Sequence, residues 1–319
     1  MSQIGVANRR NINVALPAAA SFQAPMKEVC FQSPHPVSFK VSRPSLEQTV
    51  KIRHIQTLEV AGLEPYRTLR RPVEHERNGI FVAEGEKVVR RLMESEIEIV
   101  STLLTPAWFT LYESLLESRG PSLQVFVAEK PLLETIVGFN MHQGIMAVGR
   151  IPKAPTLGAV LKSTERPHLL AAVDGLTSSE NLGVLVRNCA AFGVQALIVG
   201  ETCTSPYLRR AVRNSMGAIF TLPIINVSSL ARSLRDLRST YSVRTIAAHP
   251  RADRKTLYRT DLRHDVCIVF GSEGVGISNS VLEACDESVA VPMNEGIDSL
   301  NVASASAVFL SEAVRQRKT

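Results

Sequence analysis

Hydrophobic and polar positions alternate in two distinct patterns along the chain from residue 46 onward. Short, nearly continuous apolar runs such as "HLLAAVDG" (168–175) are typical of strands buried on both faces. Segments such as "EKVVRRLMES" (86–95) instead repeat their aliphatic residues at helical spacing. The two patterns follow one another repeatedly, which predicts an α/β protein with helices packed on sheets.

The pattern divides this part of the chain in two. Residues 46–150 predict a small α/β unit, with the helix at 86–95 and strands at 79–85, 97–105, 123–129 and 143–151. Residues 151–165 contain Pro152 and Pro155 between short polar stretches and predict a linker.

Residues 166–319 predict a larger and more regular domain. Strands are expected at 168–175, 196–201, 221–227, 244–250, 266–274 and 288–293, and helices at 181–194, 205–219, 228–240 and 300–317. Regular alternation of this kind predicts a doubly wound parallel sheet, in which a ligand binds beyond the carboxyl ends of the strands.

Residues 1–45 show neither pattern. They contain five prolines and a single acidic residue, Glu28. One interpretation is a disordered leader, which leaves the protein in the cytoplasm. The alternative is a targeting peptide for an organelle, because the segment is poor in acids and rich in Ser and Ala.

Composition narrows the partners only slightly. The chain of 319 residues has 36 Lys and Arg against 30 Asp and Glu, a net charge of +6. Arginine pairs well with phosphate, so the excess favours a nucleic-acid partner, although many basic enzymes bind none. The five cysteines lack zinc-ligand spacing and predict buried thiols and no metal. No apolar run is long enough for a membrane span.

Three polar loops follow predicted strands of the larger domain. The loop "FGSEGVGIS" (270–278) is rich in glycine, as are loops that bind dinucleotide phosphates. Its spacing is G-x-x-G-x-G rather than G-x-G-x-x-G, and Glu273 would repel a phosphate. A nicotinamide-dependent oxidoreductase is therefore the least favoured function.

The loop after the first strand of this domain carries Asn181, Gly183 and Arg187. Asn181 is either the N-cap of the following helix or a functional side chain. Arg187 has apolar neighbours and needs either a counter-charge, for which Glu273 is a candidate, or a ligand oxygen. The residues alone leave these alternatives open.

Three segments together carry a specific resemblance. "NLGVLVRNCAAFGV" (181–194), "GSEGVGIS" (271–278) and "VPMNEGIDSLNVASASAVFLSEAVRQR" (291–317) occur in this order, each after a predicted strand. They resemble the three motifs of the SpoU/TrmH family of RNA ribose 2′-O-methyltransferases, within the SPOUT superfamily. "GIFVAEGEKVVRRLMES" (79–95) and "HQGIMAVGRIP" (142–152) are similar to the family's N-terminal, ribosomal-protein-like domain that binds the RNA substrate.

The resemblance implies a fold and a cofactor. The fold is a SPOUT domain whose last helix is threaded into a deep trefoil knot that holds S-adenosylmethionine. Small residues at 303–306 would allow the close approach that threading requires, although a tightly packed helix without a knot would also select them.

The resemblance also implies site residues by motif match. The catalytic residues would be Arg187, Asn181, Glu273, Ser299 and Asn301, and the cofactor contacts would be Gly271, Val291, Met293 and Leu300. The family proposal makes the arginine a base. Because the pKa of arginine is so high, we instead expect Arg187 to orient an RNA phosphate and stabilise the oxyanion.

The function implied is methyl transfer to a ribose 2′-OH in structured RNA, with rRNA favoured over tRNA and DNA excluded. The protein is expected to be a homodimer. An RNA-binding assembly factor of the same fold with little activity is the main alternative. Glu295 and Asp298 add negative charge to the third motif and leave the target nucleotide open.

Overall fold

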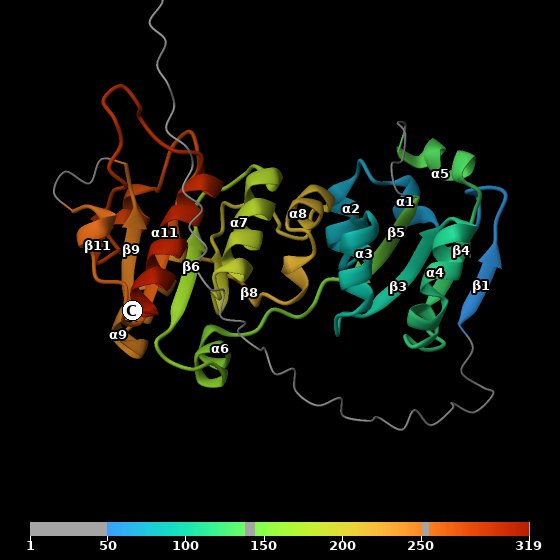
Figure 1. Ribbon diagram of the computed structural model, residues 1–319, viewed down its shortest axis with the longest axis horizontal. Helices are drawn as coiled ribbons and strands as arrows, with labels where there is room; N and C mark the ends of the chain where they lie inside the picture. The colour runs from blue at the N-terminus through green and yellow to red at the C-terminus, as the bar shows by residue number, and fades with distance from the viewer. Residues whose placement is uncertain (1–49, 138–143, 251–254, 319) are drawn as a thin grey trace, which may run out of the picture. The chain divides into compact units, whose positions relative to one another are not determined.

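The computed structural model describes residues 50–137, 144–250 and 255–318 (Figure 1). The predicted leader, residues 1–45, lies outside these ranges. Two sheets with their helices lie within one compact unit, Ser45–Thr319. No helix in the described ranges combines the length and the apolar character needed to cross a bilayer.

The first sheet has the strand order β1-β4-β3-β5-β2. Strand β5 pairs antiparallel with both β2 and β3, while β1, β4 and β3 run parallel. The four predicted strands are confirmed, and the sheet also contains β1, which the sequence pattern missed. The strands are β1 (Lys51–His54), β2 (Ile80–Glu84), β3 (Ile99–Leu104), β4 (Gln124–Val127) and β5 (Ile145–Arg150).

The described residues between β1 and β5 form five helices. Only α3 was predicted, and its buried residues Val88, Val89, Leu92 and Met93 confirm the helical spacing. The helices are α1 (Glu64–Arg67), α2 (Pro72–Arg77), α3 (Glu86–Met93), α4 (Pro106–Glu117) and α5 (Lys130–Val137).

The second sheet has the strand order β11-β9-β10-β6-β7-β8, and all its pairings are parallel. This confirms the predicted doubly wound sheet. The chain order reverses at β6, so the loops after β6 and β10 meet at one edge. The strands are β6 (Leu169–Val173), β7 (Ala196–Val199), β8 (Ile224–Asn226), β9 (Arg244–Ala248), β10 (Val266–Phe270) and β11 (Glu287–Val289).

Helices cover both faces of the second sheet. In β6, Leu169, Ala171 and Val173 face one apolar cluster, and Leu170 and Ala172 face the other. The first cluster includes residues of α7 (Ser179–Ala191) and α11 (Val302–Arg317), and the second includes residues of α6 (Leu157–Ser163), α9 (Leu230–Tyr241) and α10 (Asn279–Leu282). Burial on both faces explains why the strand sequences are almost wholly apolar.

Helix α11 packs closely against α7 through small and polar residues. Asn188 Nδ2 of α7 donates to Ala303 O at 2.8 Å and to Ser306 Oγ at 2.9 Å. Ala303 and Ser306 are both buried, so their small side chains allow this approach. The threading of α11 into a knot stays a prediction.

The far end of α11 is fastened to the opposite edge of the sheet. The Arg317 guanidinium donates to the carbonyl oxygens of Pro167, His168, Leu262 and His264. Burial of this side chain lowers the pKa of Arg317. Helix α11 therefore runs from the carboxyl edge of the strands to their amino edge (Figure 1).

Two local predictions differ from the structure. The helix predicted at 205–219 is shorter: α8 spans Arg209–Asn214, because Met216 and Gly217 take positive φ angles of 53° and 81° and end it. A 3₁₀ helix, η1 (Ala218–Phe220), follows. The predicted linker 151–165 contains helix α6, whose N-cap Thr156 accepts a hydrogen bond from Ala159 N at 3.2 Å.

Packing between α7 and α8 yields a stability prediction. A Cβ atom at Gly183 would lie 2.4 Å from Ala211 O, a backbone atom that cannot move alone. Gly183→Ala should therefore separate the two helices and lower the free energy of unfolding by about 1–3 kcal/mol. Chemical unfolding measures this loss. Gly274→Ala is the control, because nothing lies within 4 Å of its added Cβ; equal stability of the two variants would contradict the packing argument.

Candidate active site

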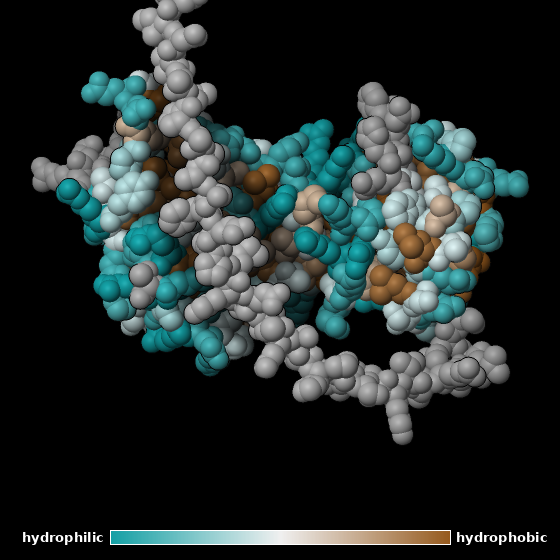
Figure 2. Space-filling view, in the orientation of Figure 1, coloured by the Kyte–Doolittle hydropathy of each residue, from teal (hydrophilic) through white to brown (hydrophobic). Residues whose placement is uncertain are grey.

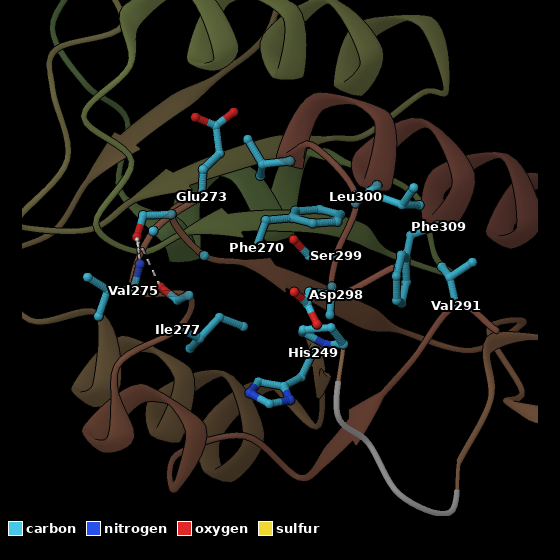
Figure 3. Close-up of a pocket in the computed structure, with 18 of the residues that line it drawn as sticks. His249, Phe270, Glu273, Val275, Ile277, Val291, Asp298, Ser299, Leu300 and Phe309 are labelled. Atoms are coloured by element: carbon cyan, nitrogen blue, oxygen red, sulfur yellow. Dashed lines mark hydrogen bonds between the residues drawn. The ribbon is translucent and has the colours of Figure 1, made fainter. Parts of the chain in front are cut away.

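A cavity of about 390 Å³ opens at the carboxyl ends of β9 and β10 (Figure 3). Its walls come from the segments 248–250, 270–277 and 289–309, which are far apart in sequence. Apolar walls are formed by Phe270, Ile277, Val291, Leu300 and Phe309, and Phe270 meets Phe309 edge to face with ring centroids 5.9 Å apart. The volume suits a small organic ligand.

The glycine-rich loop after β10 is folded tightly. Ser272 N donates to Gly276 O at 3.0 Å and Gly276 N donates to Ser272 O at 3.1 Å. A Cβ at Gly271 would lie 2.3 Å from the backbone of Gly276, so only glycine allows this closure. The closed loop forms one rim of the cavity.

Glu273 joins the three sequence motifs. Its Oε1 accepts hydrogen bonds from Asn181 Nδ2 and from Asn301 Nδ2, the latter at 2.5 Å. Asn301 Nδ2 also lies 3.3 Å from Asn181 Oδ1. Hydrogen bonds to an ionised carboxylate are stronger than neutral ones, so this cluster holds α7, the glycine-rich loop and α11 together. Glu273 points from the cavity rim toward α7 in Figure 3.

Asn301 uses both ends of its amide. While its Nδ2 donates to Glu273, its Oδ1 accepts from Ala303 N at 2.9 Å and makes Asn301 the N-cap of α11. The N-cap of α7 is Ser178, whose Oγ accepts from Asn181 N at 3.3 Å. The alternative in which Asn181 caps α7 is therefore wrong, and its side chain is available to Glu273.

Arg187 lies away from this cavity. Its exposed side chain lines a separate depression of about 450 Å³, together with Arg91, Glu94 and Thr221. No ion pair joins Arg187 to Glu273 within the described ranges, so the proposed salt bridge is wrong. The physical reason is position: Arg187 lines the separate depression on α7, while Asn181 and Asn301 donate to Glu273 at the cavity.

The arginines of α8 are engaged within the chain. Arg209 pairs with Glu84, and Arg213 Nη1 lies 3.6 Å from the same carboxylate. Arg210 Nη1 lies 3.0 Å from Glu180 Oε1. Because Glu84 ends β2, the pairs of Arg209 and Arg213 join α8 to the first sheet, while Arg210 pairs with Glu180 of α7. All three pairs reduce the positive charge that α8 offers to a phosphate.

The four residues predicted to contact the cofactor, Gly271, Val291, Met293 and Leu300, all line the cavity, as does Ser299. Ala248, His249 and Pro250 also line it and were not predicted as site residues. They follow β9, so the rule that ligands bind beyond the carboxyl ends of parallel strands was the available signal.

The charge of the lining is negative. Glu273 and Asp298 contribute carboxylates, and among the described residues no Lys or Arg lines the cavity. No cluster of three metal-ligating side chains occurs in the part of the chain that the structure describes.

The buried Cys189 and Cys267 thiols have pKa values raised by burial, which makes them structural rather than nucleophilic.

Figure 2 shows hydrophobic residues in several places among the hydrophilic ones on this face of the described residues. The apolar cavity next to α11 is defined by its lining residues. Three features define an α/β ligand-binding enzyme domain. They are the parallel sheet, the closed glycine-rich loop at the point where the strand order reverses, and the start of α11, which is held by the Glu273 carboxylate.

Comparison with known proteins supports the assignment to an α/β enzyme domain. Residues 168–311 match the SpoU rRNA Methylase family. The chain is 37% identical over 204 residues to the 23S rRNA (guanosine-2′-O-)-methyltransferase RlmB of Yersinia pestis, covering 63% of this chain and 82% of that protein. It therefore belongs to the SpoU rRNA methylase family.

Solved structures show the same fold. The SpoU methyltransferase AviRb from Streptomyces viridochromogenes, in complex with AdoMet, superposes with a TM-score of 0.71 at 24% identity, over 81% of this chain and 99% of that one. An RNA 2′-O ribose methyltransferase superposes with a TM-score of 0.67 at 26% identity, over 84% of this chain and all of that one.

The Glu273 cluster yields a pH prediction. Asn301→Asp keeps the cap oxygen but places a second carboxylate against Glu273. Repulsion raises the pKa of the introduced carboxyl in the folded state above its value in the unfolded chain. The charge repulsion is therefore absent in acid, grows as the pH rises from the unfolded-state pKa towards the raised folded-state pKa, and levels off above it. Unfolding free energies across about pH 3 to pH 8 measure it.

Asn301→Ser is the matched control. It keeps a capping oxygen without adding charge, and its difference from the wild type should not change with pH. If the Asp and Ser variants lose stability in parallel across the pH range, the carboxylate-centred cluster does not hold the loops.

Proposed function

We propose that this protein transfers a methyl group from S-adenosylmethionine to a ribose 2′-OH of rRNA. The observation that supports this most directly is the union of three motif loops around one cavity through Glu273. Membership of the SpoU family and similarity to RlmB proteins, named as 23S rRNA 2′-O-methyltransferases, support the reaction and the substrate class.

The residues of the cavity fit this cofactor. Aliphatic walls at Ile277, Val291 and Leu300 suit a flat adenine, and the main chain of the glycine-rich rim offers donors and acceptors. The carboxylates suit a cationic ligand, whereas a nicotinamide dinucleotide would place its pyrophosphate against Glu273 and Asp298 without a described cation in the lining.

The cofactor supplies an electrophilic methyl group on a sulfonium. The chain has to hold the ribose oxygen in line with that methyl group and keep water away. Asn181, Ser299 and Asn301 lie at the rim and position the substrate and the loop, while Glu273 fixes the two amides. Arg187 orients an RNA phosphate and stabilises the developing oxyanion.

The separation of Arg187 from the cavity supports a homodimer. Arg187 is exposed on α7 and makes no hydrogen bond or ion pair with any residue that the structure describes. A two-fold dimer would allow the exposed Arg187 of one copy to reach the cavity of the other. Each site would then consist of one copy's cavity and the second copy's arginine.

The reaction is tested with purified protein, S-adenosylmethionine labelled in the methyl group, and rRNA from cells that lack the protein. We expect label in nuclease-resistant 2′-O-methylated dinucleotides, and none in a DNA copy without the 2′-OH. Arg187→Ala should lower the rate by roughly 10²–10³-fold with little change in cofactor affinity. Tight binding of RNA and cofactor without any methylation would instead indicate an assembly factor.

The shared site is tested with mixed dimers. One copy carries Arg187→Ala and the other Leu300→Arg, which adds a positive charge to the cavity, and different tags isolate the mixed species. One complete site remains if the arginine acts across the dimer, giving about half the wild-type activity. An inactive mixed dimer would place Arg187 in its own copy's site, and a monomer would exclude the dimer itself.

A further inference from the structure

The two carboxylates of the cavity differ in what they bind. The Glu273 carboxylate is already engaged by the amides of Asn181 and Asn301. Asp298, in contrast, is exposed and makes no hydrogen bond or ion pair with any described residue. Figure 3 shows Asp298 near the middle of the labelled cavity residues, between His249 and Ser299. Its negative charge is therefore available to a ligand.

We propose that Asp298 recognises the sulfonium of the methyl donor and so discriminates the donor from its product. This inference rests on the proposed function and assigns one residue a specificity role within it. The donor carries a positive charge on sulfur, and the product, S-adenosylhomocysteine, has a neutral thioether there. Both keep the same adenosine, ammonium and carboxylate groups, so only the charge on sulfur and the methyl group separate them.

Apolar residues of the same cavity favour such an interaction. Asp298 is exposed in the free protein, but Ile277, Leu300 and Phe309 line the cavity with it, so a ligand that fills the cavity displaces water from around the carboxylate. The backbone of this segment is anchored on its C-terminal side, because Asn301, three residues on, caps α11 and donates to Glu273. An anchored backbone leaves less of the segment to be ordered when a ligand binds.

A role on the RNA side is less favourable for Asp298. A carboxylate next to an RNA phosphate is repulsive, and a substrate hydroxyl needs no full charge to bind. The other titratable side chains described in the cavity lining are Glu273 and His249, and neither adds a fixed positive charge that would neutralise Asp298. Product release after methyl transfer then follows from the loss of charge on sulfur.

The test is calorimetric binding, without RNA, of S-adenosylmethionine and S-adenosylhomocysteine to wild type and Asp298→Asn. The variant should bind the donor roughly tenfold more weakly, while its affinity for the product changes by less than about twofold. Sinefungin, which carries an ammonium group in place of the methylated sulfonium, should follow the donor. The ratio of the two affinities is the readout, and no turnover is required.

Glu295→Gln is the matched control, because it removes a charge from the same loop at an exposed residue that does not line the cavity. It should leave both affinities unchanged. Equal weakening of donor and product by Asp298→Asn, or no weakening, would overturn the inference. Asp298→Ser also removes the carboxylate. An unchanged melting temperature of this variant shows that a weaker affinity for the donor does not come from a folding defect. If the wild type binds neither ligand, the proposed function itself is wrong.

Discussion

The hydrogen bonds around the Glu273 carboxylate are the constraint on which the site depends. Glu273 Oε1 accepts hydrogen bonds from Asn181 on α7 and from Asn301 at the start of α11. The three residues are about 30 to 120 positions apart in sequence. Because Asn301 also caps α11, the position of the cavity rim and the beginning of the last helix are fixed by the same side chain. A ligand therefore meets a preformed wall rather than three independent loops.

The sheet provides the rigidity that these contacts require. Strands β6 and β10 are buried on both faces and lie side by side at the centre of the second sheet, so the loops after them begin at fixed points. Close packing of α7 against α8 and α11, through Gly183 and Ser306, carries the same rigidity to the first motif. The site is thus held by packing on one side and by charge-assisted hydrogen bonds on the other.

The sequence predicted much of this architecture and part of the site. Strongly apolar strands and well-spaced helices such as α3 were predicted correctly, because burial selects their residues directly. Strand β1, "KIRH", was missed because three of its four residues are polar and all four are exposed. Helix α8 was predicted too long because the positive φ of Met216 has no sequence signal. Gly271, Val291, Met293 and Leu300 were placed at the cavity by motif resemblance.

The position of Arg187 could not be predicted in the same way. Arg187 lies nearly two helical turns further along α7 than Asn181. The face of α7 that meets Glu273 is set by packing against α8 and α11, which the spacing does not predict. Apolar neighbours in sequence suggested a buried charge, but on a helix the neighbours at i±1 point elsewhere. The exposed position of Arg187 is a property of the tertiary structure alone.

Helix α11 is held at both ends, by Asn301 at the cavity and by Arg317 at the four carbonyl oxygens of the opposite edge. The helix therefore connects the two edges of the sheet as one rigid element. A substitution of Arg317 would loosen the position of the cavity rim from the other side of the domain. A survey of variants ranked by distance from the ligand would overlook this residue, although it bears on the same wall.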